Sequence, residues 1–90
     1  MFKTLEELIA VIRQRKVSSD EESYTKKLLN DKKLSIEKVK EEIAELIDAI
    51  EKNTNKVHEA ADILYHLMVF LEANDIKIED VMDELKKRQK

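Results

Sequence analysis

Apolar residues recur about every 3.6 positions along nearly all of this chain, and that spacing is typical of amphipathic helices. No segment alternates as a half-buried strand does, and no internal repeat is present. We therefore predict an all-α fold, with about five helices in a single domain over residues 1–90. The two most regular segments, near residues 36–52 and 56–73, are joined by a short turn, so we expect them to lie antiparallel as neighbours.

The predicted helix starts depend on small polar residues that can accept a hydrogen bond from a free backbone N–H group. Thr4, with Glu7 three residues later, has the spacing of a capping box for the first helix. Ser19 or Asp20 can cap the second helix, which ends near residue 30, and Ser35 can cap the third. The polar turn at residues 53–55 precedes the fourth helix and can cap it. The fourth helix is predicted to end at residues 74–75, and a fifth begins near Ile78.

The distribution of apolar residues predicts association of two chains. Residues 63–71 are apolar almost all the way round a helix, and a helix of that kind is normally buried. Three short amphipathic helices cannot easily cover it. We therefore expect a homodimer in which the third and fourth helices of both protomers build a shared four-helix core. The first helix should bury Leu5, Leu8, Ile9 and Ile12. The apolar stripe of the third helix is Ile36, Val39, Ile43, Leu46, Ile47 and Ile50.

Composition excludes several classes of function. The net charge of −3 argues against a nucleic-acid-binding protein, which would need an excess of basic residues. The chain has no glycine, so the glycine-rich loops that cradle phosphates are excluded. It has no cysteine, so disulfides and thiolate metal sites are excluded. The longest apolar run has nine residues and residues 1–5 lack the apolar region of a signal peptide, so we expect a soluble, cytoplasmic protein.

Two pairs of acids with the same spacing are the main functional signal. Glu42 and Glu45 lie in one predicted helix, and Glu59 and Asp62 lie at the start of the apolar fourth helix. Taken alone, the first pair could be a solvated helix face, and the second could be an ion-paired helix N-terminus. Because the two helices pack antiparallel, however, the pairs can face each other, and four carboxylates would repel without a cation. Carboxylate oxygens are the ligands that Mg²⁺ prefers, with Mn²⁺ as an alternative, so we predict a divalent metal site there.

The acidic pattern also resembles a known signature. It reads E-E-x-x-E, a 13-residue gap, then E-x-x-D, and it is similar to that of the all-α nucleoside-triphosphate pyrophosphohydrolases of MazG type. One branch, the phosphoribosyl-ATP pyrophosphatase family, resembles this chain over about residues 4–88. The similar segments are Ser-Tyr-Thr-Lys-Lys-Leu-Leu at 23–29, Lys-Val-Lys-Glu-Glu at 38–42 and His-Glu-Ala-Ala-Asp-Ile-Leu-Tyr-His-Leu at 58–67.

The resemblance implies hydrolysis of phosphoribosyl-ATP to phosphoribosyl-AMP and pyrophosphate, the second step of histidine biosynthesis, with Mg²⁺. It implies water attack at the α-phosphorus and the following roles. The metal ligands would be Glu42, Glu45, Glu59 and Asp62. The proton acceptor would be Glu41 or Glu45. The residues that bind substrate would be Lys38, Lys27, Tyr24 and Thr25. To these we add His66, which shares a polar stripe with Glu59 and Asp62. The alternative interpretation is that His66 is a buried histidine of the core.

Two other functions remain open from the sequence. The same fold and metal could serve a MazG-like enzyme that hydrolyses ordinary NTPs or dNTPs. A non-catalytic helical dimerisation module with an acidic face is the third hypothesis, and it predicts no response to Mg²⁺.

Overall fold

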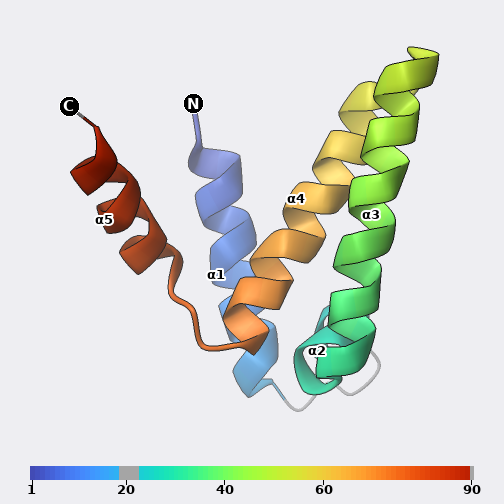
Figure 1. Ribbon diagram of the computed structural model, residues 1–90. Helices are drawn as coiled ribbons and strands as arrows, with labels where there is room; N and C mark the ends of the chain where they lie inside the picture. Colours follow the sequence, from blue (N-terminus) through green and yellow to red (C-terminus); the bar gives the residue numbers. More distant parts are fainter. Residues whose placement is uncertain (19–22, 90) are drawn as a thin grey trace.

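The computed structural model describes residues 1–18 and 23–89, and within them it contains five α-helices and no strand (Figure 1). This arrangement confirms the predicted all-α class and the number of helices. Their bounds are α1 Lys3–Val17, α2 Tyr24–Asn30, α3 Lys32–Lys52, α4 Lys56–Ala73 and α5 Ile78–Arg88. The fourth helix occupies residues 56–73, as the apolar pattern predicted.

The long hairpin of α3 and α4 is the centre of the molecule. The two helices lie side by side and antiparallel, and α2 packs near the start of α3 and the C-terminal half of α4 (Figure 1). The α1 helix crosses α4, whereas α5 stands apart from the other helices and follows the end of α4 (Figure 1). No helix among the described residues is both long and apolar enough to cross a bilayer.

The predicted caps at the starts of α1 and α3 were wrong. Thr4 lies inside α1, which begins at Lys3, and the residue before the helix makes no side-chain capping bond. The α3 helix is capped by Asp31, whose side chain accepts from the Leu34 amide at 3.0 Å. The capping residue lies four residues before Ser35, which is buried inside the helix.

The remaining helix junctions rest on polar residues as well. The α2 helix is capped by Ser23, whose hydroxyl accepts from the Lys26 amide at 3.3 Å. The caps predicted for this helix, Ser19 and Asp20, lie outside the described residues. Between α3 and α4, Asn53 and Asn55 both have left-handed backbone angles, with φ of 54° and 51°. Asparagine enters this region more readily than most residues, so it makes the turn in a chain without glycine. Neither turn residue donates or accepts a side-chain cap for α4, although the turn lies where it was predicted.

The core lies where α1, α2 and the C-terminal half of α4 meet. Its buried members are Ile12, Leu28, Leu29, Met68, Val69 and Ala73. Of the residues predicted to be buried on the first helix, Ile12 is fully buried, and Leu5, Leu8 and Ile9 pack partly buried around it. The apolar stripe of α3 behaves differently, because Ile36, Ile43, Ile47 and Ile50 are 40–57% exposed in the single chain.

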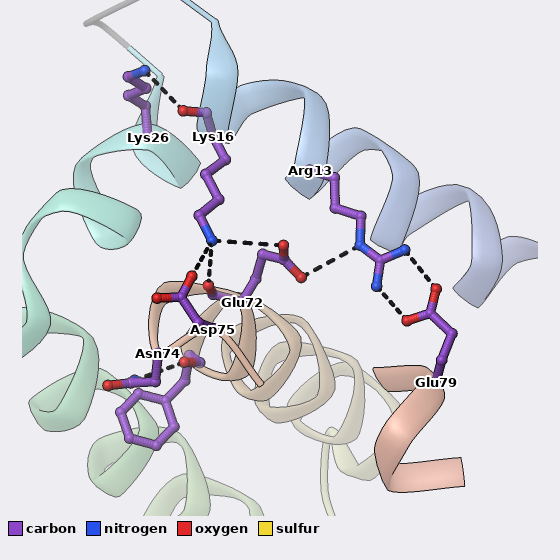
Figure 2. Close-up of polar contacts among 8 residues, drawn as sticks. Arg13, Lys16, Lys26, Glu72, Asn74, Asp75 and Glu79 are labelled. Carbon is purple, nitrogen blue, oxygen red and sulfur yellow. Dashed lines mark hydrogen bonds and ion pairs between the residues drawn. The ribbon is translucent and has the colours of Figure 1, made fainter. Parts of the chain in front are cut away.

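A network of ion pairs joins α1, the C-terminal end of α4 and the start of α5 (Figure 2). The Arg13 guanidinium donates to both carboxylate oxygens of Glu79, with Nη1 2.9 Å from Oε2, and to Glu72 at 3.4 Å. Lys16 donates to Asp75 at 2.8 Å and to the Glu72 carbonyl at 3.0 Å. No residue of α5 is fully buried, and Ile78 is the α5 residue that packs, partly buried, against the core. The ion pair between Arg13 and Glu79 therefore adds to a small apolar contact.

Candidate functional site

The α3–α4 hairpin brings the two predicted acid pairs together. Glu42 and Glu45 face Glu59, and one carboxylate oxygen from each lies within 4.8 Å of the others. A second group of ligand atoms within the same distance joins His58, Glu59 and Asp62. Glu59 belongs to both groups, so all four predicted ligands form one continuous acidic cluster.

Two oxygens of this cluster are buried and have no donor among the described residues. They are Oε2 of Glu42, a residue only 8% exposed, and Oε2 of Glu59. An unpaired buried polar atom is rare in proteins, and burying a charge without a partner is costlier still. A cation placed among these oxygens would remove that cost, so the residues present fit a divalent metal with oxygen ligands.

The electrostatics of the cluster agree with this. Burial raises the pKa of Glu42, and the neighbouring carboxyl of Glu45 raises it further. Burial and Glu45 also raise the pKa of Glu59. The neighbouring His66 and His58 rings oppose these increases in pKa only in part. The cluster therefore has an excess of negative charge that a bound cation would balance.

His58 is a member of the cluster that was not among the predicted site residues. Its side chain is 70% exposed, but its Nε2 lies 3.3 Å from Oδ2 of Asp62. The signal that could have found this contact was the i,i+4 spacing of the two residues on α4.

Glu41 and Lys38 lie beside the cluster rather than in it. The Lys38 ammonium is 3.3 Å from Oε2 of Glu41, and this hydrogen bond raises the pKa of Lys38. Glu41 is exposed and belongs to neither group of ligand atoms. Of the two candidate proton acceptors, the structure therefore brings Glu45 to the cluster and leaves Glu41 paired with a lysine.

The substrate-binding candidates of α2 are fastened to α4 by two hydrogen bonds. The Tyr24 hydroxyl lies 3.0 Å from Nε2 of His66, and the Thr25 hydroxyl bonds to that of Tyr65. The His66 Nδ1 is in turn 2.8 Å from the Asp62 carbonyl oxygen, in the helical turn that carries the metal candidate. Sequence reasoning missed these pairs, which join residues 42 and 40 positions apart.

Lys27 is the predicted residue that the structure does not bring to the cluster. It is exposed on α2, and its side chain forms no hydrogen bond or ion pair with another residue in the described ranges 1–18 and 23–89. Tyr24, by contrast, is close enough to Lys38 and Glu42 for both charges to affect its pKa. The arrangement thus places an uncompensated acidic cluster, a lysine and a tyrosine hydroxyl around one end of α2. Such a set can bind a divalent cation together with a phosphorylated ligand.

Comparison with known proteins supports the same chemistry. A model of the phosphoribosyl-ATP pyrophosphohydrolase family matches residues 5–89. A phosphoribosyl-ATP pyrophosphatase of Methanocella arvoryzae is 42% identical over 95 positions that cover all of both chains. One from Caulobacter sp. (strain K31) is 40% identical over 91 positions, which cover 99% of this chain and 85% of the relative.

A third relative is a longer protein. A bifunctional histidine biosynthesis protein of Pyrococcus furiosus is 44% identical over 87 positions. The aligned region covers 96% of this chain, which spans only 41% of that protein's length. Because the family model and full-length relatives both match, the chain belongs to the phosphoribosyl-ATP pyrophosphohydrolase family.

Proposed function

We propose that this chain hydrolyses phosphoribosyl-ATP to phosphoribosyl-AMP and pyrophosphate, the second step of histidine biosynthesis, with Mg²⁺ or Mn²⁺ as its cofactor. One observation carries the proposal: a member of this family has two buried, unpaired carboxylate oxygens in one acidic cluster. The family match favours phosphoribosyl-ATP over ordinary nucleoside triphosphates. The unpaired oxygens argue against a non-catalytic module, which would gain stability from neutral residues there.

Four residues would hold the metal in this proposal, namely Glu42, Glu45, Glu59 and Asp62. A divalent cation among them supplies positive charge to the phosphate oxygens and makes a nearby water molecule more acidic. His58, which lies against Asp62, orients that carboxylate.

The protein's own groups would then act on the substrate as follows. A water molecule attacks the α-phosphorus, and Glu45 accepts its proton, since Glu41 is already paired with Lys38. The bond between the α-phosphorus and the bridging oxygen breaks, and its electrons leave with pyrophosphate. Lys38 can swing from Glu41 to the departing phosphate and stabilise its developing charge. Lys27, exposed on α2, would contact the outer part of the substrate.

A release assay tests this function directly. Pyrophosphate would be measured with phosphoribosyl-ATP and, separately, with ATP and each dNTP, in Mg²⁺ and again after chelation. We expect a strong preference for phosphoribosyl-ATP and loss of release on chelation. Turnover of dNTPs instead would assign the chain a MazG-like activity, and no release from any substrate would overturn the enzymatic proposal.

We also propose that the chain works as a homodimer. The face of α3 formed by Ile36, Ile43, Ile47 and Ile50 is exposed, and α4 exposes Val57, Leu64 and Leu67. Monomeric proteins rarely leave so many large apolar side chains together in water. A second copy of the chain would cover both faces and complete the four-helix core expected from the sequence.

Sedimentation velocity at micromolar concentration tests the dimer. The wild-type protein should sediment as a dimer, and Ile47→Glu should shift it to a monomer by placing a charge in the apolar face. Lys40→Glu, an exposed charge reversal on the same helix, is the matched control and should remain dimeric. A monomeric wild type would refute the proposal.

A further inference from the structure

His66 is held on both sides of its ring. It is 8% exposed, so more than nine-tenths of the residue is buried. Its Nδ1 lies 2.8 Å from the Asp62 carbonyl oxygen, and its Nε2 lies 3.0 Å from the Tyr24 hydroxyl. The rings of Tyr24 and Tyr65 pack edge-on against it, with centroids 5.9 and 5.0 Å away. Neither ring nitrogen is free to meet a substrate.

These two contacts fix the direction of the hydrogen bond to Tyr24. A carbonyl oxygen can only accept, so the Nδ1 of His66 must carry the proton that faces Asp62. In a neutral imidazole the other nitrogen is then an acceptor. The Tyr24 hydroxyl therefore donates its single proton to Nε2, and only its oxygen lone pairs face outward. Burial raises the pKa of Tyr24, so the phenol keeps this proton at neutral pH.

The outward lone pairs limit what Tyr24 can recognise. Phosphate oxygens at neutral pH accept hydrogen bonds and do not donate them, so they would be repelled by another acceptor. The groups of a nucleotide that can donate are its sugar hydroxyls and the N–H groups of its base. Tyr24 lies near Lys38 and Glu42, beside the cluster where the α-phosphate would react. The donors nearest to that phosphate are the hydroxyls of the ribose that carries it.

We propose that His66 is a positioning residue. It accepts the hydrogen bond from the Tyr24 hydroxyl, so that the Tyr24 oxygen accepts a hydrogen bond from a ribose hydroxyl of the substrate and does not bind a phosphate. This inference rests on the proposed function and adds to it a source of specificity. It replaces the direct substrate contact that sequence reasoning gave to His66.

The hydrogen bond between Thr25 and Tyr65 allows the effect of His66 on Tyr24 to be separated from a simple role in anchoring α2. This second hydrogen bond joins α2 to α4 one residue further on, and the Tyr24 and Tyr65 rings stack with centroids 6.4 Å apart. Loss of the His66 acceptor should therefore free the Tyr24 proton while α2 stays in place.

Steady-state kinetics on phosphoribosyl-ATP and its 2′-deoxy and 3′-deoxy analogues, altered in the ribose that carries the triphosphate, provide the first test. Tyr24→Phe should raise KM about tenfold for the parent substrate with kcat little changed, the effect of one lost hydrogen bond. For one of the deoxy analogues the same substitution should have no further effect. A uniform effect on all three substrates, or an effect on kcat alone, would overturn the proposal.

Substitutions at His66 separate acceptor chemistry from packing. His66→Gln keeps an acceptor for the Tyr24 proton and should retain the selectivity for the ribose hydroxyl, whereas His66→Leu should lose it. Tyr65→Phe is the matched control and should raise KM equally for all three substrates. If Tyr65→Phe discriminated among them as Tyr24→Phe does, the assignment to Tyr24 would be wrong.

The tautomer of His66 gives a readout that does not depend on turnover. Nitrogen-15 chemical shifts of the ring, measured at pH 8 in chelator, should show a protonated Nδ1 and an unprotonated Nε2. A protonated Nε2 would overturn the proposal even if the enzyme were active. The expected tautomer in a protein without pyrophosphatase activity would refute the proposed function while leaving the geometry of His66 intact.

Discussion

Two clusters of carboxylates lie at different places in this small protein, and they differ in whether cations accompany them. Between α1, α4 and α5, every carboxylate of the ion-pair network contacts Arg13 or Lys16 (Figure 2). Between α3 and α4, Glu42 and Glu59 each bury an oxygen that no donor among the described residues reaches. The first cluster joins helices together, whereas the uncompensated charge of the second destabilises the α3–α4 hairpin that carries it.

The pKa values of the carboxylates shift in opposite directions in the two clusters. The hydrogen bond from Arg13 lowers the pKa of Glu79 to about 2, and Lys16 lowers that of Asp75. Burial raises the pKa of Glu42 and of Glu59. The comparison teaches that an acidic cluster is evidence of a ligand site only where its charge is left uncompensated.

Replacement of one acid by glutamine in each cluster should give the largest difference in activity and stability between the two clusters. Glu42→Gln should lower kcat about 10³-fold by removing a metal ligand, since a catalytic ion contributes several kcal/mol. In chelator the same variant should melt about 3–5 °C above the wild type, because a buried unpaired charge is gone. Glu79→Gln should do the reverse, with a lower Tm and an unchanged kcat per folded molecule. Kinetics and thermal denaturation of both variants check this, and parallel behaviour would remove the distinction between the clusters.

Divalent metal should stabilise one cluster and leave the other unaffected. At a Mg²⁺ concentration 100 times its Kd, linkage predicts about 2.7 kcal/mol of added stability for the wild type. Glu42→Gln should lose most of this gain, whereas Arg13→Gln should retain it, because Arg13 lies in the compensated cluster. Denaturant unfolding with Mg²⁺ and with chelator measures the difference. An equal gain in all three proteins would mean that the ion binds elsewhere.

Removal of the arginine should expose the weaker, structural role of the ion-pair network. Arg13→Gln should lower Tm by about 2–4 °C, since partly exposed ion pairs contribute little individually. High salt should bring the wild type towards the variant, because it screens exposed charges. Lys40→Glu, away from the network, controls for a simple change of net charge. A loss of kcat in Arg13→Gln that persists well below its Tm would show that the network also serves the reaction.

The pH dependence of stability should be the smallest effect and should change sign. In chelator, native Glu42 takes up its proton at a higher pH than the unfolded chain does, so stability rises as pH falls towards about 4.5. Below that value the unfolded chain binds protons first at Glu79, whose native pKa is about 2, so stability falls. Denaturant unfolding across this range should show a maximum in mild acid, and Glu42→Gln should flatten the rise above it. A wild-type stability that falls steadily from neutral pH would contradict the interpretation.

Local patterns in the sequence were enough to predict the helices but not all of their starts. The bounds of α4 follow from a long apolar segment between polar turns, a signal that few alternatives share. The start of α3 was wrong because Asp31 and Ser35 are both good caps, and the choice depends on which amide the side chain reaches.

The candidate site was predictable where it depends on one hairpin. Glu42, Glu45 and Glu59 are brought together by two adjacent helices, and antiparallel pairing follows from a short turn. The bonds from Tyr24 to His66 and from Arg13 to Glu79 were not predictable, because they join positions 42 and 66 residues apart. Such contacts depend on how α1, α2 and α5 pack around the hairpin, and no local spacing specifies that.

The turn at residues 53–55 also limits how relatives of this chain can vary in length. An α-helix turns about 100° and advances about 1.5 Å with each residue. One residue inserted into the helical part of α3 after Glu45, or of α4 before Glu59, would therefore rotate the acids of one helix away from those of the other. Replacement of Asn53 by glycine keeps the register and the left-handed backbone, so point changes are tolerated here where insertions are not. Insertions and deletions among functional relatives should accordingly collect outside residues 45–59.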